Sequence, residues 1–379
     1  MSRLDIDQTD LHIMAALDQL GAKTSAREIY NHLKKAYEKG DTKSTTDLPK
    51  PRTIRYRLNK LYEKELLHSP RIMTHERKMG LGEHIIEIEE IPSETKRLLR
   101  IIEAIPSFYW WTAVYGKYNG YEVHAMYPLT MPNLDRMLLE EMRDVGLISD
   151  YHILDIVDYE LKTTDFHRIQ PDNSLNWDWQ SWPGDFTSIN PEDIPLDLNF
   201  SKGTGVAQFD HQDVLILEKM IQNSKITQRK LAKELELSEG SVSARIRRME
   251  NEGIIKGYKP AYTPGGERIH VALYIEIAKN PWAVLAKISE LPFLIGISAE
   301  SLNKYCLKIG ISSGIFKHFM DRFHVLRPYL KSYFLQYQAL LRRKSGEHES
   351  VFDLFDSEKN TWVIPVDDSL DLIRSLSAQ

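Results

Sequence analysis

Cysteine is almost absent from this chain of 379 residues, which contains only Cys306. A single cysteine cannot form an internal disulfide, and it cannot supply the cysteine pairs of a zinc site. The apolar neighbours Tyr305 and Leu307 favour a buried strand residue over a nucleophile. We therefore predict neither a disulfide nor a cysteine-based metal site.

Long apolar runs are missing as well, because no stretch of about 18 apolar residues occurs. The first ten residues are polar and acidic, unlike a signal peptide. We expect a soluble cytoplasmic protein without a membrane partner. The net charge of −5 indicates that any surface for nucleic acid must be local.

Catalytic signatures are also lacking. The sequence contains no glycine-rich phosphate loop, no HExxH motif and no nucleophile elbow. The 13 histidines are scattered, and pairs such as His318 and His324 are more typical of helix surfaces than of metal sites. We therefore predict no enzymatic activity, no metal and no cofactor.

The most informative pattern covers residues 227–258. Two short amphipathic helices are separated by a tight break and followed by the strand-like residues 254–258. Thr227 and Ser238 can cap the two helices, and Gly253 can end the second one. This order predicts a winged helix-turn-helix. The alternative is a solvated helix in some other small bundle.

In the winged-helix interpretation, residues 238–251 enter the major groove of double-stranded DNA. At about 100° per residue, Ser241, Arg245 and Arg248 fall on one row, which we expect to face the groove. Arg247 lies further round the helix and would meet a phosphate. The candidate DNA contacts of this motif are Thr227, Gln228, Ser238, Ser241, Ser243, Arg245, Arg247 and Arg248.

The N-terminal residues repeat this plan. Residues 6–10 resemble 209–213, and 53–61 parallel 241–249, but a polar insertion precedes Arg52. Residues 1–80 carry 16 Lys and Arg against 11 Asp and Glu, so this copy is locally basic. A solvated helix face is the alternative to a phosphate contact. The candidate contacts are Lys50, Arg52, Arg55, Arg57 and Lys60.

A second pattern follows each winged helix. Alternating apolar residues and amphipathic segments predict the order βαββαβ, which is the ferredoxin-like unit. The expected strands are 84–91, 107–115, 121–127 and 149–161, then 269–277, 293–299, 305–311 and 331–341. The expected helices are 93–105, 131–145, 281–291 and 313–326.

The run Arg245–Glu250 followed by Gly253–Tyr258 resembles the end of the winged helix in the Lrp/AsnC family of regulators. The resemblance covers about 5–160 and 209–343. It implies an α+β chain with two winged helix-turn-helix domains and two ferredoxin-like, RAM-type domains. It also implies a sequence-specific transcriptional regulator that forms an intramolecular pseudo-dimer, a homodimer, or both.

The same resemblance implies an amino-acid-like effector. The family's ligand loop has glycine, any residue, an aromatic residue and aspartate, and Gly116, Tyr118 and Asn119 match it with Asn in place of Asp. The loss of charge weakens the hold on an amino group, and a simple hairpin turn is the alternative. The corresponding residues 300–304 of the second half lack the glycine.

Two other functions stay open. Siroheme decarboxylases also join an Lrp-like helix-turn-helix to a ferredoxin-like domain, and His124 and Arg100 are the residues that such a pocket could recruit. A scaffold that has lost DNA binding is the third possibility.

The expected domains are 1–80, 81–161, 209–264 and 265–345, with a linker at 162–208 and an extension at 346–379. Because exposed indoles favour association, we expect Trp177, Trp179 and Trp182 of the linker to be packed. The alternative is an aromatic docking box. In the extension, a strand at 361–366 and a helix at 370–376 suggest an added edge strand or a dimerisation arm.

Overall fold

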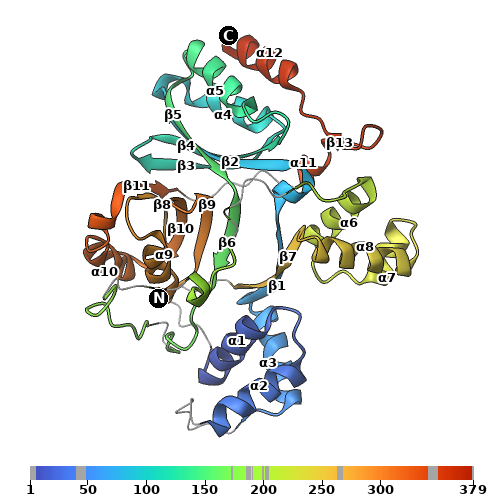
Figure 1. The fold of residues 1–379 in the computed structure, drawn as a ribbon, viewed down its shortest axis with the longest axis vertical. Helices are drawn as coiled ribbons and strands as arrows, with labels where there is room; N and C mark the ends of the chain where they lie inside the picture. Colours follow the sequence, from blue (N-terminus) through green and yellow to red (C-terminus); the bar gives the residue numbers. More distant parts are fainter. Residues whose placement is uncertain are drawn as a thin grey trace.

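The computed structural model describes residues 6–39, 48–171, 174–184, 189, 191–198, 200, 205–262, 268–339 and 349–377. The predicted α+β fold class is confirmed, with two winged helix-turn-helix domains and two ferredoxin-like units (Figure 1). Most of the polar insertion of the first copy, residues 40–47, lies outside the described residues. No helix of the described ranges is long and apolar enough to cross a membrane.

The two winged domains are built alike. The first contains α1 (Gln8–Leu20), α2 (Ala26–Glu38), α3 (Pro51–Glu63) and β1 (Leu67–Thr74). The second contains α6 (His211–Gln222), α7 (Gln228–Glu234), α8 (Glu239–Asn251) and β7 (Ile255–Tyr262). Aspartate capping boxes begin α1 and α6, so the repeat in the sequence is a repeat in local structure. β1 pairs with β7 in an antiparallel ribbon that joins the two domains.

The ferredoxin-like units follow these domains. The first unit contains β2 (Leu81–Glu90), α4 (Thr95–Ala104), β3 (Phe108–Gly116), β4 (Gly120–Pro128), α5 (Leu134–Asp144) and β5 (Ile148–Ile156). The second unit contains β8 (Ile269–Ile277), α9 (Pro281–Glu290), β9 (Ile295–Ser301), β10 (Lys304–Ile311), α10 (Ser313–Phe323) and β11 (Leu330–Gln338). Short 3-10 turns also lie between elements, namely η1 (Glu76–Met79), η2 (Pro92–Glu94), η3 (Pro191–Asp193) and η4 (Arg327–Tyr329).

Nine strands form one continuous sheet in the order β5-β2-β4-β3-β11-β8-β10-β9-β6. β3 pairs with β11 and so joins the units, while β6 (Asp158–Lys162) leaves the first unit and pairs with β9 of the second. The halves of the sheet lie face to face, because Ile85 and Leu154 of the first unit pack with Ala272 and Cys306 of the second.

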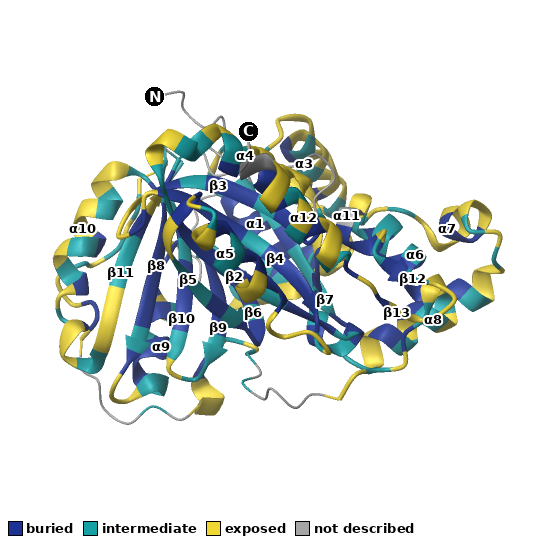
Figure 2. Ribbon diagram, turned by 90° about the horizontal axis from the view of Figure 1, so that it is seen from above, coloured by how far each residue is buried: buried dark blue, intermediate teal, exposed yellow. Residues whose placement is uncertain are grey.

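The helices cover the outer faces of the sheets. α4 and α5 pack on the first unit, and α9 and α10 on the second, each over an apolar core. Figure 2 shows the resulting pattern, in which the central strands are mostly buried and the outer helix surfaces are exposed. The chain therefore pairs the sheets of its two units within one molecule.

The linker packs against the second unit, as expected from its tryptophans. Trp182 is buried, and its indole nitrogen donates to the Lys287 carbonyl oxygen at 3.0 Å. Trp179 is half-buried, and its ring lies 6.5 Å from the ring of Phe293. The tryptophan segment is therefore part of the core of the second unit.

The C-terminal extension differs from the expectation of an added edge strand. β12 (Phe355–Asp356) and β13 (Thr361–Trp362) pair only with each other, and they follow the short helix α11 (Glu349–Phe352). Trp362 donates to the Met79 carbonyl oxygen at 2.7 Å and packs among residues of the second winged domain. α12 (Val366–Ser377) then lies on α4 and α5, where Ile373 is buried. The extension thus ties the second winged domain to the first unit through the buried side chains of Trp362 and Ile373.

The burial of Trp182 predicts a large stability effect. Trp182→Ala removes an indole from the core and should lower the free energy of unfolding by about 3–5 kcal/mol. Trp179→Ala should lower the free energy of unfolding by less, since that ring is only half-buried. Urea denaturation followed by circular dichroism measures both. Equal, negligible effects would show that the linker does not belong to the folded core.

Candidate functional site

The arginines of α8 form a structural ion-pair cluster. Arg245 Nη1 donates to both carboxylate oxygens of Asp210, at 2.9 Å each, and to Asp213 Oδ1 at 2.9 Å. Arg248 contacts the second oxygen of Asp213, which is fully buried. A buried carboxylate requires a counter-charge, so these arginines face α6. The expected groove position of Arg245 and Arg248 is corrected accordingly, whereas the DNA contact of Ser241 stays a prediction.

The first winged domain repeats this cluster. Arg57 Nη1 donates to Asp7 at 2.8 Å and to Asp10 at 2.9 Å. Arg57 occupies the position in α3 that Arg245 occupies in α8. Both arginines therefore hold the third helix of each domain against the first helix, and Arg57 does not extend freely toward a phosphate.

Basic side chains remain exposed on α3. Lys50, Arg52 and Arg55 are exposed, and no acidic residue occurs between positions 50 and 60. Lys60 pairs with Glu63 at 3.1 Å, and this pair partly neutralises its charge. Among the described residues, Arg52 and Arg55 form no ion pair. The solvent face of α3 is therefore locally cationic.

The solvent face of α8 and α7 is more mixed in charge. Thr227 and Ser238 act as helix caps, with their hydroxyls accepting from the amides of Lys230 at 3.2 Å and Ser241 at 3.0 Å. Gln228 and Arg247 are exposed, and Ser241 and Ser243 are half-buried. Residues 209–256 contain nine Lys and Arg against eight Asp and Glu. The second winged domain is therefore close to neutral.

The loop matched to the effector motif is tied to the other unit. Gln336 of β11 accepts from the amides of Lys117 at 2.6 Å and Tyr118 at 3.2 Å. Tyr118 is buried, and Glu89 accepts from the amide of Asn119. Gly116 has φ +155° and pairs with Gln336 in the sheet. The polar backbone groups that a ligand would use here already have partners.

A polar network fills the space between the two sheets. By strand register, Glu87 lies opposite Glu122 in the first unit, and Tyr274 lies opposite Cys306 in the second. Glu122 of β4 and Cys306 of β10 therefore take the same place in their units. His124 and Lys308, each two residues further along, correspond to each other in the same way. Equivalent residues meet across the pseudo-twofold axis, because the Tyr274 hydroxyl donates to Glu87 at 2.6 Å and Lys308 contacts His124.

The network shifts the pKa values of the two buried glutamates in opposite directions. Burial raises the pKa of Glu122, but Lys308, at 2.5 Å, and His124 outweigh burial and lower the pKa to about 2. Burial raises the pKa of Glu87 well above its usual value, and the nearby Glu122 raises it further. Lys308 and His124 thus favour the ionised form of Glu122, whereas burial and the nearby Glu122 disfavour the ionised form of Glu87.

His124 lies at one end of this network. Its Nδ1 is 2.7 Å from Glu83, which also accepts from the Tyr109 hydroxyl at 2.7 Å. Arg100, the other residue considered for a tetrapyrrole pocket, is exposed on α4, which covers the opposite face of the first sheet. The structure does not bring His124 and Arg100 together.

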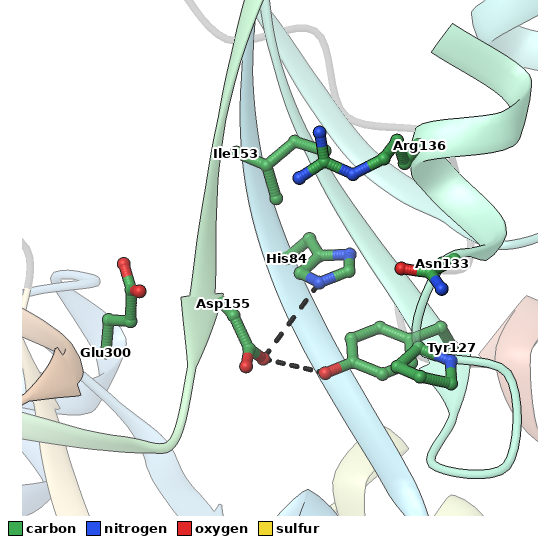
Figure 3. A pocket seen from close by; sticks show the side chains of 8 residues that line it. His84, Tyr127, Asn133, Arg136, Ile153, Asp155 and Glu300 are labelled. Atoms are coloured by element: carbon green, nitrogen blue, oxygen red, sulfur yellow. Dashed lines mark hydrogen bonds and ion pairs between the residues drawn. The ribbon is translucent and has the colours of Figure 1, made fainter. Parts of the chain in front are cut away.

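A cavity of about 210 Å³ lies on the helix side of the first sheet (Figure 3). His84 and Tyr127 form one wall, and Asp155 lies beside them on β5. Asn133 and Arg136 come from the beginning of α5, and Glu300 comes from β9. Sequence patterns missed this site, because residues far apart in the chain contribute single side chains without a motif.

Comparisons with known proteins support the fold. A family model described as a winged helix-turn-helix DNA-binding domain matches residues 209–256. The crystal structure of the siroheme decarboxylase NirDL covers 97% of this chain and 99% of its own, with a TM-score of 0.52 and 11% sequence identity. The crystal structure of the same enzyme with an iron-uroporphyrin III analogue covers 92% of this chain and 93% of its own, with a TM-score of 0.50 and 11% identity.

The structure of E. coli AsnC covers 36% of this chain and 92% of its own, with 19% identity and a TM-score of 0.28. No curated protein matches the sequence. The full-length likeness to NirDL shows that this tandem fold occurs in an enzyme, and at this identity it shows the fold alone.

The ion pair between Lys308 and Glu122 yields a pH-dependent prediction. Lys308→Met leaves a buried carboxylate without its main counter-charge, which should lower the free energy of unfolding by roughly 3–5 kcal/mol at pH 7. Because the pKa of Glu122 is depressed from 4.5 to about 2, its stabilising effect is present above pH 4.5 and is lost toward pH 2.

The loss in the free energy of unfolding that Lys308→Met causes should therefore become smaller as the pH falls from 4.5 toward 2. The double variant Lys308→Met with Glu122→Gln should recover most of the loss at pH 7, since no buried charge remains. Denaturation at several pH values measures these changes. A deficit that is independent of pH and persists in the double variant would contradict the assigned ion pair.

Proposed function

We propose that the chain is a transcriptional regulator that binds double-stranded DNA through its winged domains. The observation that carries this proposal is the exposed cationic face of α3, where Arg52 and Arg55 form no ion pair with the described residues and no acidic residue occurs between positions 50 and 60. Arginine and lysine side chains on an exposed helix supply the phosphate contacts that dominate affinity for DNA. The family model matched to residues 209–256 supports the same partner for the second winged domain.

The two winged domains would contribute unequally. The first would supply most of the phosphate affinity, because its third helix keeps its exposed arginines free of ion pairs with the described residues. The second, which is nearly neutral, would contact DNA through Gln228, Ser243 and Arg247. Because the two winged domains carry different side chains on their DNA-contacting surfaces, they favour a DNA target whose two halves differ in sequence.

A second candidate is a decarboxylase that acts on a tetrapyrrole such as siroheme. Its support is the full-length likeness to NirDL, together with His124 and Lys308 between the sheets. Glu83 and Glu122 both contact His124, however, and this acidic surrounding is unfavourable for a substrate that carries many carboxylates. Release of carbon dioxide from siroheme that is lost in His124→Gln would establish this candidate in place of the regulator.

Substitutions on α3 test the DNA proposal. Each of Arg52→Gln and Arg55→Gln should weaken binding to duplex DNA and reduce the salt slope by about 0.9 for each lost phosphate contact. Arg100→Gln is the matched control, since Arg100 is an exposed arginine on α4. Fluorescence anisotropy with a labelled genomic duplex at several salt concentrations measures affinity and slope together.

The proposal fails if wild-type protein shows no salt-dependent binding to duplex DNA. It also fails for the first winged domain if both α3 variants retain the wild-type slope. Thermal denaturation of each variant excludes unfolding as the cause of lost binding.

A further inference from the structure

The third helix of the first winged domain has a solvent face whose residues are not all explained by phosphate contacts. Ile54 and Leu61 are buried, and Arg57 holds the same side of α3 against α1. At about 100° per residue, Tyr56 and Asn59 lie on the opposite side of the helix, one turn apart. Both side chains are exposed. α3 therefore presents them outward, where a groove of DNA would meet the helix.

The C-terminal end of α3 is already occupied. The Lys225 ammonium of the second winged domain lies 3.4 Å from the centre of the Tyr62 ring, and Glu63 pairs with Lys60 at 3.1 Å. An acidic side chain at this end repels the phosphates of DNA. The part of the solvent face that suits DNA therefore comprises residues 52–59.

Tyr56 is a large aromatic side chain on a polar surface, and it is 61% exposed. A single exposed tyrosine is common in soluble proteins, so its neighbours decide its interpretation. Arg52 lies one turn before it and Arg55 directly precedes it, and neither arginine forms an ion pair with a described residue. When these arginines bind phosphates, the ring beside them is brought to the groove, where contact with a base removes apolar surface from water.

Asn59 carries a polar group that matches a base edge. Its carboxamide is exposed and forms no hydrogen bond with the described residues. The carboxamide offers an oxygen acceptor and an NH2 donor side by side. In the major groove, adenine presents N7 as acceptor and N6 as donor, a pattern that distinguishes it from the other bases. The Asn59 side chain therefore suits an adenine.

The second winged domain carries different side chains at these two places. Counted from the equivalent arginines of the two ion-pair clusters, Ala244 takes the place of Tyr56, and Arg247 takes the place of Asn59. Ala244 and Arg247 are both exposed. An arginine matches the O6 and N7 acceptors of guanine. The two third helices therefore offer different groups to equivalent base pairs.

We propose that Tyr56 and Asn59 recognise base edges in the major groove of one half of the DNA target, an inference that rests on the proposed DNA-binding function. Asn59 forms two hydrogen bonds with an adenine, and Tyr56 contacts the C5 methyl group of a nearby thymine. Arg247 recognises a guanine at the equivalent position of the other half. A·T pairs therefore specify the half bound by the first winged domain, and a G·C pair specifies the other.

Exchange of residues between the two helices tests the assignment on the full chain. Selection from a random duplex pool with wild type should enrich a motif of two unlike halves. Asn59→Arg should change an adenine to a guanine at one position of one half and leave the other half unchanged. The reciprocal variant, Arg247→Asn, should change a guanine to an adenine in the other half only.

The tyrosine contact is tested by removing single methyl groups from the DNA. Each thymine of the enriched motif is replaced in turn by deoxyuridine, and one replacement should weaken wild-type binding by about fourfold, the effect of one lost apolar carbon. Tyr56→Ala should bind the two duplexes equally, whereas Tyr56→Phe, which keeps the ring, should keep the difference. Tyr115→Ala is the matched control, since Tyr115 is exposed on β3 outside the winged domains. Fluorescence anisotropy measures these affinities.

The outcomes separate this assignment from the DNA-binding proposal. Enrichment of no motif by wild type would refute both. An enriched motif that stays the same in Asn59→Arg, or equal binding of wild type to every deoxyuridine duplex, would overturn the assignment while DNA binding stands. Thermal denaturation shows whether each variant is folded. Asn59→Ala, which should lose the adenine preference, replaces Asn59→Arg if the arginine disturbs the helix.

Discussion

Equivalent positions of the two units carry different residues, and these residues contact each other between the facing sheets. The pairing of the two sheets depends on these contacts. In a homodimer with twofold symmetry, each residue near the axis meets its own copy. Glu87 would then meet a second glutamate, and buried carboxylates facing each other are unfavourable. In the tandem chain the equivalent position is Tyr274, whose hydroxyl donates to Glu87 at 2.6 Å. His124 likewise meets Lys308. Covalent duplication therefore allows a charged interface that identical subunits could not form.

This asymmetry extends from the sheets to the winged domains. The β1–β7 ribbon fixes one domain relative to the other. Among the described residues, the C-terminal extension packs on the second winged domain through Trp362 and on the first unit through the buried face of α12. The first domain keeps exposed arginines on α3, whereas the second is nearly neutral. The proposed regulator would therefore present two different surfaces to DNA from an intramolecular pseudo-dimer.

Apolar periodicity predicted the helices and strands of both units, because a helix face and a strand face each repeat at a fixed spacing. The same periodicity placed Arg245 and Arg248 on one face of the helix, but it does not indicate which element packs against that face. Asp210 and Asp213 were recognisable as caps of their own helix, yet their pairing with α8 is a tertiary contact. The cavity beside His84 escaped prediction for a related reason, since its walls come from separate strands and one helix start. Local patterns thus fixed the elements, while the charged contacts between elements required the structure.

Selection of DNA from a random duplex pool by the purified full chain tests the central claim most directly. The account predicts enrichment of a motif whose two halves differ, bound by one chain per site as judged by native mass spectrometry. It attributes the difference between the halves to the unequal third helices of the two winged domains. Absence of enrichment above the unselected pool, or a symmetric motif bound by one chain, would contradict it.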